Sequence, residues 1–98
     1  MTREEKIRKH VDRCVDDYKN ECGLSFQMHT MIPDSREHIV NIGTSVLCTK
    51  WKVGYPGGSF VQAVVDNNLR EAIGRADSIN QDCLKFYVLL IYNSAHIE

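Results

Sequence analysis

The chain is organised around residues 50–62, KWKVGYPGGSFVQ, where a basic and aromatic segment turns through Pro-Gly-Gly into a predicted helix start. Pro56 fixes its own φ angle, and the two glycines after it carry no Cβ, so a ligand can approach the backbone amides. Serine is a preferred N-cap residue, so Ser59 is the predicted N-cap of this helix. Gln62 lies three residues later, where a capping box places its reciprocal partner. This stretch therefore predicts a turn followed by a capped helix.

The same stretch suggests an anion-binding site. N–H groups at a helix start point outward at the positive end of the helix dipole, which favours phosphate or carboxylate, and Lys50 and Lys52 add positive charge nearby. The alternative is that the turn only redirects the chain and caps the helix. The stretch matches neither a Walker A loop nor G-x-G-x-x-G, so we expect no standard nucleotide-binding loop.

Composition narrows the class of protein. The 98 residues predict a single domain, 1–98, with a thin core, so we expect a homo-oligomer. A formal net charge of −1 argues against coating of DNA or RNA. Widely spaced cysteines and a charged N-terminus predict a reduced, cytoplasmic protein, and scattered histidines predict no metal site. The longest apolar run is too short to span a membrane, and we expect no cofactor.

The predicted fold is α+β. Thr2 and Glu5 form a capping-box pattern that opens an amphipathic N-terminal helix over residues 3–22, with Gly23 placed to end it. Apolar residues then alternate over 24–30, and β-formers fill 38–43 and 44–52, which predicts a small antiparallel sheet of two to three strands.

Two C-terminal helices are expected after this sheet. The first begins at Ser59 and has an interruption or polar face at Asn67 and Asn68. The second begins at Asp77 and Ser78 and carries the most apolar segment of the chain.

The candidate site combines the turn with a polar cluster downstream of it. Arginines grip phosphate oxygens bidentately, amide and carboxylate groups read base edges, and aromatic rings stack on purines. No nucleophile–base arrangement stands out, so we expect no catalytic residues and no enzyme. The predicted ligand is a small phosphate-containing nucleotide, and the candidate ligand-binding residues are Trp51, Tyr55, Gly57, Gly58, Ser59, Phe60, Asn68, Arg70, Arg75, Asp77 and Asn80.

Residues 51–80 carry the elements W-x-V-G-Y-P-G-G-S-F-V, N-N-L and R-A-D-x-x-N. With these elements the segment resembles small phage proteins of the Thoeris anti-defence type, which sequester nucleotide immune signals. The resemblance implies a non-enzymatic oligomer, built from a small sheet and C-terminal helices, that encloses a cyclic ADP-ribose isomer or a cyclic oligonucleotide in the host cytoplasm. It further implies base stacking by Phe60 and phosphate or base contacts by Arg70, Arg75, Asp77 and Asn80.

Two other functions fit the sequence. One is a small inhibitor or adaptor that binds a host protein through the charged face of the first helix or through the sheet edge. The other is a small enzyme that acts on nucleotides. Three observations distinguish these functions. A protein partner indicates an inhibitor or adaptor, a metabolite bound intact indicates sequestration, and a converted metabolite indicates an enzyme.

Overall fold

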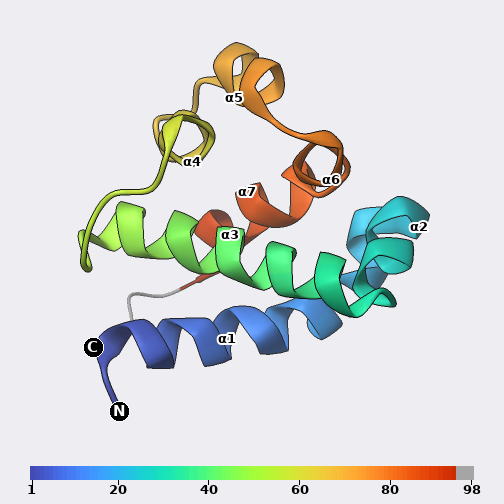
Figure 1. The fold of residues 1–98 in the computed structure, drawn as a ribbon, viewed down its shortest axis with the longest axis horizontal. Coiled ribbons are helices and arrows are strands. Elements are labelled where there is room, and N and C mark those ends of the chain that lie inside the picture. The colour runs from blue at the N-terminus through green and yellow to red at the C-terminus, as the bar shows by residue number, and fades with distance from the viewer. Residues whose placement is uncertain (95–98) are drawn as a thin grey trace.

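The structure is a computed structural model that describes residues 1–94, and these residues fold into helices connected by short turns (Figure 1). The helices are α1 (Arg3–Asp17), α2 (Lys19–Thr30), α3 (Pro33–Trp51), α4 (Ser59–Val65), α5 (Leu69–Arg75), α6 (Ser78–Asp82) and α7 (Leu84–Asn93). The described residues contain no β-strand, so the predicted α+β class and its antiparallel sheet are wrong. The fold is all-helical.

The misread segment 24–30 shows why the sheet prediction failed. Phe26 and Thr30 are buried, whereas Leu24 and Met28 are exposed. Buried positions four residues apart share one face of a helix, whereas an alternating strand would have buried all four. Residues 38–51 likewise belong to α3, and Lys52 is its C-cap. The β-branched side chains of α3 pack at helical spacing, because packing overrides their strand preference.

The N-terminal helix is shorter than predicted. Its start is confirmed: Glu5 N donates to Thr2 Oγ1 at 3.2 Å and Thr2 N donates to Glu5 Oε1 at 3.3 Å, which is a complete capping box. The helix stops at Asp17 rather than residue 22, and α2 begins after Tyr18. Gly23 has φ of 87° and breaks the helical backbone, as expected of a glycine at a helix end.

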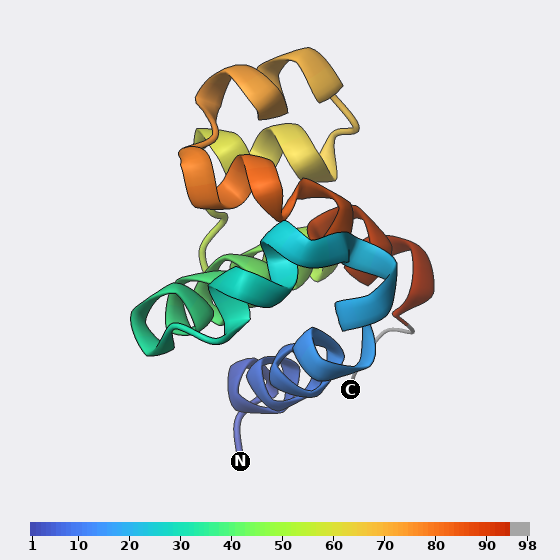
Figure 2. The same cartoon turned by 90° about the vertical axis from the view of Figure 1, so that its right-hand side faces the viewer.

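Helices α1 and α3 run antiparallel and pack side by side. Arg8 bonds Asn41 near the middle of α3, and Arg36 bonds Asp16 near the end of α1 and the start of α3. Figures 1 and 2 show α3 between α1 and α7, with α4, α5 and α6 on the side away from α1. Side chains from α1, α2, α3, α4 and α7 meet in one apolar core.

Helices α1 and α7 both approach the backbone of α3 closely at Gly43. A Cβ there would lie 2.8 Å from Val11 Cγ1 and 3.0 Å from Leu90 Cδ1, both of which are buried. Glycine is therefore required because α1 and α7 press on α3 from two sides.

The C-terminal region contains more helices than the two predicted. The expected interruption occurs at Asn67, which has φ of 58°, and Asn68 then caps α5. Asp77 caps α6, as its side-chain type predicts, and a further break at Cys83 separates α6 from α7.

Substituting two helical glycines tests this packing. Gly43→Ala should lower the free energy of unfolding by roughly 1–2 kcal/mol, because overpacking against stiff, buried Val11 outweighs the gain in helix propensity. A Cβ added at Gly74 in α5 would have no atom within 4 Å. Gly74→Ala should therefore raise the free energy of unfolding by roughly 0.5–1 kcal/mol. Urea unfolding followed by circular dichroism measures both, and a stabilised Gly43→Ala variant would contradict the close approach.

Candidate functional site

The Pro-Gly-Gly turn packs closely against α3. Gly57 N donates to Thr49 Oγ1 at 2.8 Å, so this amide has an internal partner. A Cβ on Gly57 would meet the Ser45 hydroxyl and would lie 2.7 Å from Val61 Cγ1. Gly57 therefore serves contact between the turn and the helices, not the approach of a ligand.

The start of α4 differs from the predicted capping box. Gly58 is the N-cap, Ser59 is the first helical residue, and no side chain caps the helix. Gln62 Nε2 instead donates to the Gly57 carbonyl at 2.7 Å. Gly58 and Ser59 are exposed, so this end of the turn remains open to solvent.

Two predicted ligand contacts lie in the core. Phe60 is buried, and its ring meets that of Tyr87 edge-on at a centroid distance of 5.8 Å. Asn80 is also buried, and its Oδ1 accepts a hydrogen bond of 2.8 Å from the Tyr87 hydroxyl. Neither side chain can stack on a base or read its edge without leaving the core.

Two further predicted residues are helix caps. Asn68 Oδ1 accepts from Glu71 N at 3.3 Å, and Asp77 Oδ1 accepts from Asn80 N at 2.7 Å. Asp77 Oδ2 also lies 3.2 Å from His38 Nε2, within ion-pair range although this histidine nitrogen lacks hydrogen-bond geometry.

The remaining predicted residues lie on α5, at the end of α3 and on the turn before α4. On α5, Arg75 Nε donates to Glu71 Oε2 at 2.8 Å, and Arg70 is exposed. Trp51 packs partly buried against the core, whereas Tyr55 is 96% exposed on the turn. Of all the predicted ligand-binding residues, only Asn68 lines either of the two surface hollows described below.

The larger hollow is an open groove of about 560 Å³ between α1 and α3. Each helix contributes four side chains at positions i, i+3, i+4 and i+7, which share one helical face. Three basic and three acidic residues balance each other, so the groove has no net charge to attract phosphate. Its lining residues are Glu5, Arg8, Lys9, Asp12, Pro33, Arg36, Glu37 and Val40.

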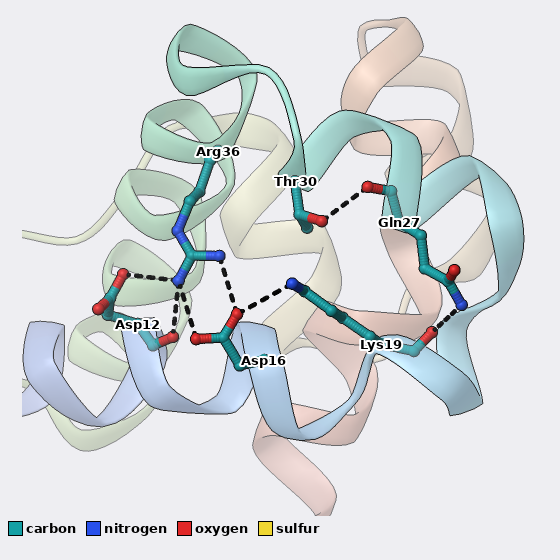
Figure 3. A network of polar contacts seen from close by, with 6 residues as sticks. All are labelled: Asp12, Asp16, Lys19, Gln27, Thr30 and Arg36. Atoms are coloured by element: carbon teal, nitrogen blue, oxygen red, sulfur yellow. Dashed lines mark hydrogen bonds and ion pairs between the residues drawn. The ribbon is translucent and has the colours of Figure 1, made fainter.

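Arg36 is committed to a network at one end of this groove (Figure 3). Its guanidinium bonds Asp12 Oδ1 at 3.1 Å and Asp16 Oδ1 at 3.1 Å, and Lys19 Nζ lies 3.2 Å from Asp16. The hydrogen bond from Arg36 lowers the pKa of Asp16. The network links α1 to α3. Because the Arg36 guanidinium already bonds two carboxylates, it is not available to an anionic ligand.

The most accessible apolar feature is a stripe along α2 and the turn after it, which sequence reasoning missed. We call it the α2 stripe; its side chains are between 53% and 79% exposed, and its members are Leu24, Met28, Met31 and Ile32. Leu24 and Met28 are four residues apart on one face of α2, and Met31 and Ile32 follow in the turn between α2 and α3. The four-residue spacing of Leu24 and Met28 is present in the sequence. Apolar residues also alternate over 24–30, and that alternation predicted a strand instead.

A cysteine–histidine pair also escaped the sequence analysis, although the i, i+4 spacing of His10 and Cys14 on a predicted helix signals it. Cys14 Sγ lies 3.5 Å from His10 Nε2, which is 2.8 Å from Ser94 Oγ. Arg13 can only donate to Nδ1, at 3.2 Å, so Nε2 carries the proton.

This pair does not form an activated nucleophile. A protonated Nε2 cannot accept the Cys14 proton, and burial raises the pKa of the Cys14 thiol. Burial, with Arg13 as a second cause, lowers the pKa of His10, so both groups stay neutral. Burial likewise raises the pKa of Cys83 to about 12.

Within residues 1–94, three or more histidine, cysteine or acidic side chains do not gather into a potential metal site, and His96 lies outside these residues. The same part of the chain has no helix with the length and apolar character needed to cross a bilayer. Comparison with protein-family models, with curated proteins and with solved structures gave no match in any of the three.

The role of Asn80 can be tested by removing its partner hydroxyl. Tyr87→Phe should lower the free energy of unfolding by roughly 1–3 kcal/mol, because the buried Asn80 Oδ1 loses its hydrogen bond from Tyr87. Thermal unfolding measures the change, with Tyr55→Phe as an exposed control that should leave stability unchanged. Equal stability of the Tyr87→Phe and wild-type proteins would argue against a structural role for this bond.

Proposed function

We propose that the protein is a non-enzymatic inhibitor or adaptor that docks α2 into an apolar groove on a partner protein. The observation that carries the proposal is the α2 stripe, an exposed apolar face on a helix whose other face is buried. Soluble proteins seldom leave several large apolar side chains adjacent and exposed unless the patch binds something.

The spacing of the stripe suits one binding mode. Helices that insert into a groove anchor themselves through residues at i, i+3 or i+4, and i+7, as Leu24, Met28 and Met31 are spaced here. Methionine is unbranched and polarizable, so two methionines in the stripe adapt to an irregular groove. Four large apolar side chains, each more than half exposed, make an extensive apolar patch for so small a domain.

The opposite face fixes α2 to the body of the domain. The Phe26 ring lies 4.9 Å from that of Phe86, centroid to centroid, and His29 Nε2 lies 2.9 Å from Asp82 Oδ2. Within α2 itself, Figure 3 shows the bonds from Thr30 Oγ1 to the Gln27 carbonyl, 2.7 Å, and from Gln27 Nε2 to the Lys19 carbonyl, 3.0 Å, which stabilise the helix. A helix held in this way binds without a large ordering cost.

Charged groups adjoin the stripe and provide a rim. Ile32 is followed directly by Pro33, which lines the α1–α3 groove together with Arg36 and Glu37. An apolar centre with a polar margin is the usual anatomy of a protein interface, and the margin contributes mainly to partner choice.

Replacement of Met28 tests this proposal. Met28→Glu should weaken partner binding at least tenfold, because it places a charge in the apolar contact. The domain should stay folded, because the Met28 side chain is exposed. The measurement is affinity capture from host lysate with immobilised wild-type and variant proteins, followed by titration of the purified partner.

Leu69→Glu is the matched control, since it places the same charge on an exposed leucine of α5 and should keep full binding. A partner captured equally by the wild-type and Met28→Glu proteins does not use the α2 stripe. If the wild-type protein captures no protein that the Met28→Glu variant loses, the proposal is wrong.

Sequestration of a cyclic nucleotide signal, with the protein in the host cytoplasm if it is phage-encoded, is the second candidate. One observation favours it: Lys50 and Lys52 at the end of α3, Tyr55 on the turn, and Gly58 and Ser59 at the start of α4 are all exposed. These groups supply an aromatic face, positive charge and unhindered backbone. Against it stand the internal roles of Phe60, Asn68, Asp77 and Asn80.

Calorimetric titration with cyclic dinucleotides, cyclic trinucleotides and cyclic ADP-ribose isomers tests this candidate. If the turn binds one of them, Tyr55→Ala should weaken binding about tenfold, because stacking on an aromatic ring is lost, and the fold should be unaffected. Recovery of intact ligand after denaturation would distinguish sequestration from turnover. Absence of heat with every compound would end this candidate and leave the protein-binding proposal untouched.

A further inference from the structure

The segment between α4 and α6 is attached to the domain by few buried side chains. Over residues 66–76, Ala72 is buried, Ala76 is partly buried, and every other residue is exposed. We infer that residues 66–76 form a lid, which opens while the rest of the domain stays folded and uncovers an apolar slot between α4 and α7.

The helices on either side of the lid are anchored in the core. Before the lid, α4 buries Phe60 and Val64. After it, Asp77 caps α6, and Asn80 of α6 accepts a hydrogen bond of 2.8 Å from the buried Tyr87 hydroxyl. Parts of a structure with few buried contacts open locally, whereas well-buried parts open only with the whole domain. Opening of the lid therefore stops at α4 and α6.

Helix α5 forms the middle of the lid and packs on α4. Figure 1 shows it at the edge of the molecule opposite α1. Asn68 Oδ1 accepts from Glu71 N and Arg75 Nε donates to Glu71 Oε2, so these bonds join lid residues to each other and not to another helix. The buried contact that opening breaks is mainly that of Ala72, whose side chain is a single methyl group.

The sequence of the lid also favours opening. Asn67 has φ of 58°, a left-handed conformation that asparagine tolerates better than most residues, and it provides a joint directly after α4. Gly74 lies within α5 and lowers its helix propensity. A helix of seven residues is too short to persist alone in water, so α5 unfolds when it leaves α4.

Opening uncovers an apolar surface. The smaller surface hollow, of about 30 Å³, lies where the lid, α4 and α7 meet, and the lid supplies part of its wall. When the lid leaves, the hollow becomes a wider slot that favours apolar groups over charged ones. The lid therefore controls access to a site for an apolar group. The apolar residues of the hollow are Ala63 and Val64 from α4, Leu69 and Ala72 from the lid, and Leu84 and Val88 from α7.

Amide hydrogen exchange of the full chain, followed by NMR at a pH where closing is faster than exchange, tests the opening. In wild-type protein, the amides of residues 72–75 should be protected at least about 100-fold less than those of Val46 and Leu47 in α3. Gly43→Ala should speed exchange of these two α3 amides about five- to thirtyfold, because it makes global unfolding easier. It should leave residues 72–75 unchanged, because the open state retains α3 and its close contacts.

Gly74→Ala is the matched variant in the lid. It should slow exchange of residues 72–75 about fivefold, because it raises the helix propensity of α5. If Gly43→Ala does not fold, Ile7→Val replaces it, since it removes one buried methyl group from α1. Equal protection of the lid and α3, equal acceleration of both by the α1 or α3 variant, or no effect of Gly74→Ala on residues 72–75 would overturn the inference.

The uncovered slot is tested with anilinonaphthalene sulfonate, a dye that fluoresces on exposed apolar surface. Asn68→Ala removes the N-cap of α5 and should open the lid about fivefold more often, so it should bind more dye than Gly74→Ala. Both variants keep the α2 stripe, so the difference between them reports the lid. Equal fluorescence of the two variants would show that opening uncovers no apolar slot.

Discussion

The fold depends on the close approach of α1, α3 and α7 at Gly43. With no Cβ at this position, Val11 from α1 and Leu90 from α7 reach the backbone of α3. A small domain has little interior, so burying α3 on two sides is an efficient use of its apolar residues. Helices α2, α4 and α6 pack around these three helices, and α5 packs on α4.

The same constraint explains why apolar side chains remain at the surface. Helix α2 buries Phe26 and Thr30 in the core, and within residues 1–94 its other side remains exposed at Leu24 and Met28. Helices α5 and α7 meet the core through Ala72 and Phe86, while Leu69 and Val88 face outward. The described residues fold no further layer over these side chains, so they stay in contact with water unless another molecule covers them.

The polar residues that suggested a nucleotide site act within the domain. Asn68 and Asp77 cap helices, Asn80 satisfies the buried Tyr87 hydroxyl, and Arg75 pairs with Glu71. A side chain that can hold a phosphate or a base edge can equally hold a backbone amide, because the donors and acceptors are the same. Sequence spacing alone does not distinguish these roles, and burial does.

What the sequence by itself determined is local. The Thr2–Glu5 cap, the break at Gly23, the interruption at Asn67 and the cap at Asp77 were all readable, because each depends on a few adjacent residues and their backbone preferences. The tertiary structure decided the rest. Whether residues 24–52 form strands or helices, and whether Phe60 faces solvent or Tyr87, depends on contacts between distant segments, and these override weak local preference.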